Sequence, residues 1–347
     1  MRFAVKRSAL PSLKKEDPMR TPVKRLLLAA ALIALLIPSV ASAAQALEGP
    51  STVLLASGLE GGSGSTVGPD GALYATEGFA GEVSRVDPRT GEITTYASGL
   101  PKSIVGIGGA MDVVFIGNTA YVLVTLVGPD VGGTDVVGIY RIDGPESFTV
   151  IADIGAFSLA NPPNTDFFVP TGVQYAIEVF QHSLLVTDGH HNRVLRVTLD
   201  GTVSELIAFG NIVPTGLEIR GSTVYMSQAG PAPHLPETGK VVSFRPQSPT
   251  VTEVASGARL AVDVEFAQSR DLYVLSQGVF LEGDPEGAPA QPNTGTLYNV
   301  DRDGTLTLVV DGLNQPTSLE FIRNTAFVIT LGGEIWRVEN ISSSPHG

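Results

Sequence analysis

The chain of 347 residues contains no cysteine and, beyond residue 43, almost no lysine. Without cysteine, neither a disulfide framework nor a lipid anchor on a thiol can form, so the fold must depend on a hydrophobic core. Lys102 and Lys240 are the two lysines after residue 43, and that part of the chain carries 14 basic and 33 acidic residues, a net charge of −19. Such a surface repels nucleic acid and anionic lipid, favours solubility and can attract cations. We therefore expect no nucleic acid among the partners.

An apolar run near the N-terminus predicts export. Leu26–Ile37 follows Lys24 and Arg25 and precedes the small residues Ala41-Ser42-Ala43. This order is typical of a Sec-type secretory signal peptide, which we predict over residues 1–43. The alternative is a membrane anchor, but the run has 12 residues, whereas a bilayer-spanning helix needs about 20. We expect the remaining chain to be secreted or periplasmic, with no membrane insertion after cleavage.

Familiar catalytic motifs are also missing from the sequence. No G-x-S-x-G or H-E-x-x-H occurs, and the glycines of residues 106–109 precede a predicted strand rather than a helix, which argues against a phosphate-binding loop. Asp301–Gly304 resembles the start of a calcium loop, but the later ligands of an EF-hand are lacking, so we interpret it as a hairpin turn. Motifs therefore do not decide whether the protein is an enzyme.

What the sequence does contain is a repeat. Helical periodicity is almost absent, and short β-rich runs alternate with Gly, Pro, Asn and Asp. One unit, Pro170–Gly210, holds four such runs, and Asp200-Gly201 joins the last two as a hairpin. We place the runs at Gly172–Ala176, Ser183–Thr187, Arg193–Leu199 and Val203–Ala208. Similar units begin 44 to 60 residues apart along the chain, a period typical of propeller blades.

The two ends of the repeat region predict how the ring closes. The sixth copy begins at Pro316 and has only three runs, whereas Ser51–Leu59 is a lone strand whose ending matches the fourth runs of other copies. Joining them completes the last blade and removes two open sheet edges. We therefore predict an all-β fold, a six-bladed β-propeller closed by the N-terminal strand. The propeller would cover residues 44–340, followed by a flexible tail over 341–347.

Long insertions mark the face on which we expect binding. They cover residues 127–135, 155–168, 229–239 and 277–295, in connections that lie on one face of a propeller, whereas the other face has tight turns. Because binding sites favour loops on a rigid frame, we predict that this face holds a small molecule, a glycan or a protein. The alternative is that the insertions are surface segments without a role.

Two aspartates form a candidate metal site. Asp112 and Asp263 occupy a first-strand slot that Gly64, Gly172 and Gly216 fill elsewhere, in the opposite second and fifth blades. Their carboxylates would face each other across the channel and would suit a hard cation, so Ca²⁺ is the one cofactor that the sequence suggests. The alternative is that each aspartate accepts backbone N–H bonds in its own turn.

Two further groups are candidates for ligand contact. Thr187–Val194 contains Asp188, His190 and His191, types that serve in metal or acid–base sites; the alternative is a turn in which Asp188 and Arg193 tie neighbouring loops. Pro-Thr pairs open three first strands, and their hydroxyls would surround the channel mouth, mainly in a structural role. These threonines are Thr171, Thr215 and Thr317.

The segments 69–77 and 187–197 and the Pro-Thr-Gly starts resemble NHL-type and gluconolactonase-like repeats, and residues 312–338 resemble the ScyD/ScyE family of exported propeller proteins. The ScyD/ScyE resemblance covers about residues 47–340 and implies fold and export rather than a reaction. The gluconolactonase resemblance implies a divalent cation on Glu, Asn and Asp at first-strand starts. In this sequence threonines occupy the first-strand starts. The residues that could replace the metal ligands are Asp112 and Asp263, with Glu77 as a weaker third.

Two main functions follow as expectations. The first is an exported binding or scaffold propeller of the ScyD/ScyE type, with its ligand or partner on the inserted face. The second is a divalent-metal-dependent, lactonase-like hydrolase in which Asp112 and Asp263 hold the cation and the cation activates water. A structural subunit of an extracellular pathway is a third reading.

Overall fold

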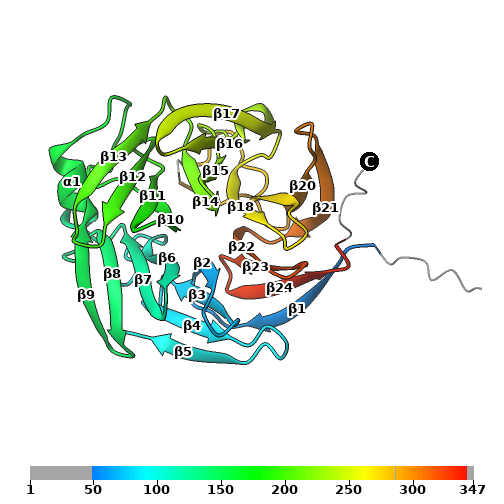
Figure 1. Cartoon of the computed structure of the whole chain (residues 1–347), viewed down its shortest axis with the longest axis horizontal. Helices are drawn as coiled ribbons and strands as arrows, with labels where there is room; N and C mark the ends of the chain where they lie inside the picture. The colour runs from blue at the N-terminus through cyan, green and yellow to red at the C-terminus, as the bar shows by residue number, and fades with distance from the viewer. Residues whose placement is uncertain (1–48, 286, 342–347) are drawn as a thin grey trace, which may run out of the picture. The chain divides into compact units, whose positions relative to one another are not determined.

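The computed structural model describes residues 49–285 and 287–341, and these residues form a ring of six four-stranded sheets (Figure 1). The expected signal peptide and all but the first residue of the expected tail lie outside the described residues. Among the described residues, no helix has the length and apolar character needed to cross a bilayer. The predicted six-bladed propeller is confirmed.

Each blade runs from an inner first strand to an outer fourth strand, with antiparallel pairing throughout. Blade one holds β2 (Gly62–Val67), β3 (Leu73–Glu77), β4 (Glu82–Val86) and β5 (Ile93–Ala97). Blade two holds β6 (Gly109–Ile116), β7 (Thr119–Thr125), β8 (Gly138–Gly144) and β9 (Ser147–Asp153). Blade three holds β10 (Gln174–Phe180), β11 (Ser183–Asp188), β12 (Arg193–Thr198) and β13 (Val203–Ala208).

The other three blades repeat this arrangement. Blade four holds β14 (Pro214–Arg220), β15 (Thr223–Gln228), β16 (Lys240–Arg245) and β17 (Ser248–Ser256). Blade five holds β18 (Ala261–Phe266), β19 (Leu272–Ser276), β20 (Gly295–Val300) and β21 (Leu306–Leu313). Blade six holds β22 (Pro316–Ile322), β23 (Thr325–Thr330), β24 (Glu334–Glu339) and β1 (Ser51–Ser57). The insertions add helix α1 (Ile154–Ala160) and the 3-10 turns η1 (Pro129–Val131) and η2 (Pro236–Thr238).

The ring closes as the repeat predicted. Strand β1 pairs antiparallel with β24, with Ser51 opposite Glu339 and Ser57 opposite Glu334. Figure 1 shows β1 lying outside β24 in blade six. The N-terminal strand therefore supplies the missing fourth strand, and the otherwise open edge of β24 is paired.

The strand registers correct one detail of the repeat alignment. In blade two, Asp112 directly precedes Val113, which pairs with Val122 of the second strand. The equivalent pair in blade three is Ile177 with Val186, so Ala176 occupies the aspartate slot there, and Gly172 does not. Gly172 instead has a positive φ of 77° and lies in the turn before β10. The predicted first strand of this unit, Gly172–Ala176, was therefore placed too early, because β10 covers Gln174–Phe180.

The core lies between neighbouring blades and consists mainly of aliphatic side chains, as expected for a protein without cysteine. One cluster joins Val83 and Ala97 of blade one to Val113 and Val122 of blade two. Similar clusters occupy further blade interfaces. Burial of each Val or Leu side chain contributes about 1.5–3 kcal/mol, so these faces supply the stability that disulfides would otherwise add.

Side-chain hydrogen bonds near the channel join every pair of adjacent blades. Four junctions use a threonine Oγ1 that donates to a backbone carbonyl of the next blade: Thr76 to Met111, Thr187 to Thr215, Thr215 to Ala261, and Thr317 to Gly62. The other two junctions use aspartates: the backbone N–H of Ile177 donates to Asp112 at 2.8 Å, and that of Leu319 donates to Asp263 at 2.7 Å. Buried polar groups at the inner strands are thus satisfied across the blade boundaries.

Candidate functional site

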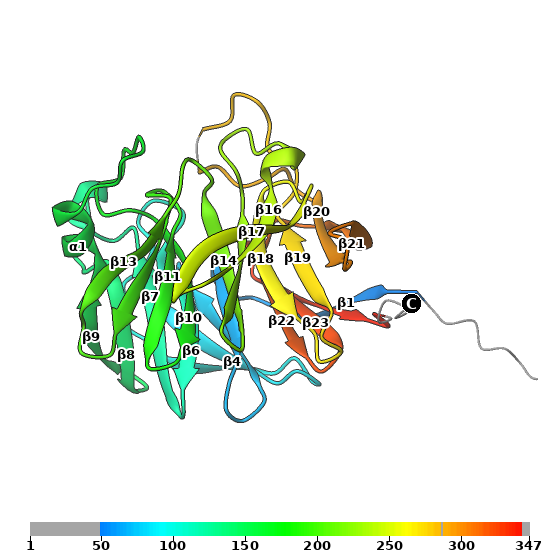
Figure 2. The ribbon, with the colours of Figure 1, turned by 45° about the horizontal axis from the view of Figure 1, so that its top comes forward.

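A cavity of about 860 Å³ occupies the centre of the ring on the face that carries the insertions. All four predicted insertions contribute to its lining, with Val131, Phe168, His234 and Ala288 as examples. Figure 2 shows the segments before β16 and β20 standing out on one side of the ring. The first strands of the blades form the deeper wall, so the cavity leads from the loops into the channel.

The mouth of the cavity is apolar and partly exposed. Phe79, Val105 and Phe168 line the cavity, and 43%, 48% and 63% of their surfaces are exposed to solvent. Ile107 and Met111 continue the apolar wall inward. Large exposed apolar side chains that gather around one opening are typical of a surface that is covered when a ligand or partner binds.

The lining carries acidic groups without basic ones. No lysine or arginine occurs among the described residues that line the cavity. Seven acidic side chains do line it: Asp112, Asp130, Asp166, Glu178, Asp263, Glu265 and Glu320. The cavity therefore combines an apolar mouth with an acidic interior.

Asp112 and Asp263 have matching environments on opposite sides of the ring. Asp112 Oδ1 accepts the N–H of Val113 at 2.8 Å, and its Oδ2 accepts the N–H of Ile177. Asp263 Oδ1 likewise accepts the N–H of Val264 at 2.9 Å, and its Oδ2 accepts the N–H of Leu319. Each carboxylate therefore joins its own first strand to that of the next blade.

The preceding blade leaves room for each of these carboxylates. A Cβ atom at Gly64 would lie 2.2 Å from Asp112 Oδ1, and one at Gly216 would lie 2.4 Å from Asp263 Oδ1. Any side chain larger than hydrogen would therefore displace the carboxylates.

These two residues do not fit a divalent-cation site well. All four carboxylate oxygens already accept backbone N–H bonds, and no group of three or more His, Asp or Glu side chains that could hold a metal occurs in the described residues. The geometry favours the structural alternative, although the bonds reach the next blade rather than only the local turn. Ca²⁺ at this position stays a prediction.

Burial determines the acid–base properties of both aspartates. It raises the pKa of Asp112 well above the usual carboxyl range, and the backbone N–H bonds of Ile177 and Val113 offset part of that rise. Burial likewise raises the pKa of Asp263 to about 7 against the N–H bonds of Leu319 and Val264.

Four glutamates of the channel were missed by the sequence analysis. Glu178, Glu218, Glu265 and Glu320 each lie two residues after the aspartate slot, on β10, β14, β18 and β22. The signal was present as Ile-Glu, Leu-Glu, Val-Glu and Leu-Glu pairs on four of the six first strands. The pattern was missed because the repeats were aligned on their glycine and aspartate positions.

Burial and mutual repulsion raise the pKa of these glutamates. The pKa values of Glu178, Glu265 and Glu320 lie well above the usual range, first because burial disfavours the charged form and then because neighbouring carboxylates repel it. Burial also raises the pKa of Glu218 to about 7, although its Oε2 accepts the N–H of Ile219 at 3.0 Å. The channel thus contains several carboxyl groups whose simultaneous ionisation is unfavourable.

The three candidate threonines act mainly within the frame. Thr215 and Thr317 line the cavity, but their hydroxyls donate to backbone carbonyls of the next blade at 2.8 and 3.1 Å. The Thr171 hydroxyl donates to Asp130 Oδ2 at 2.7 Å and is outside the cavity lining. The structural role is therefore supported by these contacts, and ligand contact stays a prediction.

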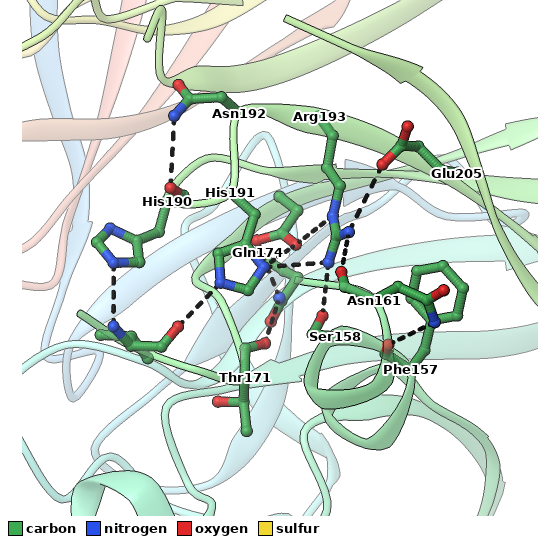
Figure 3. A network of polar contacts seen from close by, with 12 residues as sticks. Phe157, Ser158, Asn161, Thr171, Gln174, His190, His191, Asn192, Arg193 and Glu205 are labelled. Carbon is green, nitrogen blue, oxygen red and sulfur yellow. Dashed lines mark hydrogen bonds and ion pairs between the residues drawn. The ribbon is translucent and has the colours of Figure 1, made fainter. Parts of the chain in front are cut away.

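Asp188 belongs to a buried ion-pair network around Arg193 (Figure 3). Arg193 is 1% exposed, and its Nε donates to Asp188 Oδ2 at 3.0 Å. Its two other nitrogens donate to the Asn161 carbonyl at 2.8 Å and to Ser158 Oγ at 3.0 Å. Arg193 thereby fixes α1 and the start of the following insertion to blade three.

His190 and His191 both bind the same insertion, and the Nε2 atoms of the two rings have opposite hydrogen-bonding roles (Figure 3). His190 Nε2 accepts the backbone N–H groups of Phe168 and Val169 at 2.8 and 3.0 Å, so this nitrogen carries no proton. His191 Nε2 lies 3.0 Å from the Val169 carbonyl, which can only accept, so this nitrogen carries a proton and donates. His191 Nδ1 lies 3.0 Å from Arg193 Nη2 and 3.1 Å from Asp188 Oδ2. Of Asp188 and the two histidines, only His190 lines the cavity.

Glu77 also has a local role. Its Oε2 accepts the backbone N–H of Glu60 at 2.7 Å, and its Oε1 accepts the hydroxyl of Ser84. Both oxygens are therefore engaged within blade one and the segment that leads into it.

Comparison with known proteins places the fold but not the activity. Neither a scan against protein-family models nor a search of curated proteins gave a match. Among solved structures, a gluconolactonase from Xanthomonas campestris is similar with a TM-score of 0.58 and 12% identity, over 83% of this chain and 89% of that one. The apo-form of a soluble aldose sugar dehydrogenase from Escherichia coli has a TM-score of 0.58 and 13% identity, over 84% and 99%.

A virginiamycin B lyase from Staphylococcus aureus is a third similar structure, with a TM-score of 0.52 and 13% identity, over 83% of this chain and 98% of that one. Lactonase, dehydrogenase and lyase thus share one architecture with this chain at identities that carry no information about chemistry. The chain is a six-bladed β-propeller similar in fold to these enzymes.

Proposed function

We propose that this protein is an exported binding propeller that holds a small molecule with a large apolar surface in its central cavity. The observation that carries the proposal is the cavity of about 860 Å³ with exposed Phe79, Val105 and Phe168 at its mouth. This volume is within the range of small-molecule sites, and an apolar wall with a few polar groups is their usual character. The signal peptide expected over residues 1–43 is the basis for export.

The position of the insertions supports the same proposal. Helix α1 and residues up to Val169 are fixed by Arg193, His190 and His191, so one side of the mouth is held in place before a ligand arrives. A preformed wall lowers the entropy cost of binding. Loops without a role would not need buried ionic contacts of this kind.

The alternative of a metal-dependent, lactonase-like hydrolase has less support. Gluconolactonase structures share the fold, but the oxygens of Asp112 and Asp263 are used by backbone N–H groups of the ring. A hydrolase would need a cation and an activated water near these carboxylates. Binding without chemistry requires no such group.

The proposal is tested with a neutral solvatochromic dye that fluoresces in apolar surroundings. Phe168→Ser and Val105→Ser remove apolar surface at the mouth, and we expect each to weaken dye affinity about tenfold, which corresponds to about 1.4 kcal/mol. Leu308→Ser is the matched control, because Leu308 is 52% exposed on the outer strand β21. Equal dye affinity in all three variants, or no saturable binding to the unmodified protein, would refute the proposal.

A further inference from the structure

The inner part of the cavity contains carboxylates that form no contacts between the blades. The inference drawn from them concerns the ligand of the same cavity and therefore rests on the proposed function. Glu265 and Glu320 line the cavity on the neighbouring first strands β18 and β22. Neither carboxylate forms a hydrogen bond or an ion pair with any residue of the described part of the chain, whereas Asp112 and Asp263 have both oxygens engaged. Both glutamates are half-buried, and both line the cavity.

The surroundings of these two glutamates are negative. Both carboxylates are repelled by Glu178, Glu218 and Asp263. Arg220 attracts the charge of Glu218, but it does not lower the pKa of Glu265 or Glu320. Because no lysine or arginine occurs among the described lining residues, these carboxylates are neutralised either by a proton, which their raised pKa values favour, or by a cation from outside. Carboxylates without a partner in a low-dielectric cavity are costly, so their presence calls for a role other than stability.

The shape and walls of the cavity favour an organic cation over a bare metal ion. A volume of about 860 Å³ is far larger than one ion requires, and the mouth is apolar. Ca²⁺ takes six to eight oxygen ligands, whereas no cluster of three ligating side chains occurs in the described residues. An ammonium group needs only one or two carboxylates, and an attached apolar body would cover the wall around Met111 and Phe168.

We infer that the ligand is an amine: its ammonium group pairs with Glu265 and Glu320 in the channel, and its apolar body fills the mouth of the cavity. This geometry selects against carboxylates and phosphates, because the described lining residues include seven acidic side chains and no lysine or arginine. It also selects against hydrophilic amines, because these leave the apolar mouth exposed.

Three probes of equal size test the inference by calorimetry at pH 8: phenylbutylamine, phenylbutanol and phenylbutyrate. We expect the amine to bind at least tenfold more tightly than the alcohol, and the carboxylate to bind more weakly than either. Glu265→Gln and Glu320→Gln should each remove most of the amine's advantage and leave the alcohol's affinity unchanged. Glu92→Gln, at an exposed turn, is the matched control and should change nothing.

The outcomes separate the inference from the proposed function. Equal affinities for amine and alcohol would overturn the inference and leave the binding propeller intact. No binding of any of the three probes would overturn both. Calcium chloride alone is the fourth titrant, and saturable Ca²⁺ binding that both Gln variants abolish, without amine binding, would show a metal site instead.

Discussion

The carboxylates of the channel fall into two kinds. Asp112 and Asp263 accept backbone N–H bonds with both oxygens and hold neighbouring blades together. Glu265 and Glu320 have no such partners among the described residues and face the cavity. On β18, the same chemical group therefore serves the frame at Asp263 and has no hydrogen-bond partner among the described residues at Glu265, two residues further along the strand.

Replacing Asp112 tests its structural role. In Asp112→Asn only one side-chain atom can accept, so an NH₂ group would face the N–H of Val113 or of Ile177. We expect the free energy of unfolding to fall by about 1–3 kcal/mol, equally with EDTA and with Ca²⁺. Urea unfolding measures this, with Asp166→Asn at an exposed position as the control. A loss that appears only when Ca²⁺ is present would instead favour the metal site.

Arg193 offers a second test of a buried charge. Arg193→Met leaves Asp188 buried without its main cation, and we expect a loss of about 3–5 kcal/mol in the free energy of unfolding. Proteolysis should also cleave the insertion after α1 faster, because Asn161 and Ser158 lose their donor. Arg85→Met is the control, because the ion pair of Arg85 with Asp70 is exposed and contributes about 0–1 kcal/mol. Equal losses in both variants would contradict the buried network.

At the scale of elements, the first strands carry the site. Strands β10, β14, β18 and β22 each place one glutamate at the same register, so the repeat itself builds the acidic channel. Burial of these groups, and then their mutual repulsion, make the ionised channel less favourable than the neutral one. Their raised pKa values predict how stability changes with pH.

The sign of that change follows from linkage. An acid whose pKa is raised in the folded state favours folding below its unfolded pKa, about 4.3 for Glu, and this advantage is lost as pH rises through the folded value. For Glu218 and Asp263 the folded value is about 7. Ionisation of Glu265, whose pKa is well above the usual range, should therefore destabilise the fold at pH 8.

Glu265→Gln isolates this effect. We expect the variant to melt at a higher temperature than the unmodified protein at pH 8, and the difference to vanish by about pH 3, where Glu265 is neutral in both the folded and the unfolded state. Differential scanning calorimetry in steps of one pH unit measures it, with Glu92→Gln as the exposed control. A constant difference at all pH values would mean that packing rather than charge is responsible.

The elements were largely predictable, and the contacts between insertions were not. Periodic β-rich runs and the Asp200-Gly201 hairpin gave the blades, because strand period and turn chemistry are local properties. The glutamates were readable in the same way, at alternate positions of first strands. His190 and His191 bond residues 21 and 22 positions away, in a segment rich in proline and asparagine, so no local pattern indicated their partners.

At the scale of the whole molecule, one strand pairing closes the ring. Residues 53 and 337 are opposite each other on β1 and β24, although nearly the whole described chain separates them. The repeat made this closure predictable, because an incomplete blade and a lone matching strand stand at opposite ends of the sequence. The cavity was not predictable, because its volume depends on how four insertions pack.

An engineered disulfide tests the closure in a chain that has no cysteine of its own. The pair Val53→Cys and Arg337→Cys joins the ends of the ring, and Ser243→Cys with Thr252→Cys joins two strands of one blade as the control. Because stabilisation grows with the length of the closed loop, we expect the ring pair to add about 3 kcal/mol more than the control pair. Equal gains would mean that the ends stay together in the unfolded state or that closure contributes little.

The central claim, that the ligand enters the cavity, is tested most directly by the methyl resonances of methionine. Beyond the expected signal peptide the chain has two methionines: Met111 lines the cavity, and Met226 is fully buried in the core of blade four. With ¹³C-methyl methionine, titration of phenylbutylamine should shift the Met111 signal in a saturable manner and leave the Met226 signal in place. Saturable binding in calorimetry without a shift of Met111 would contradict the account.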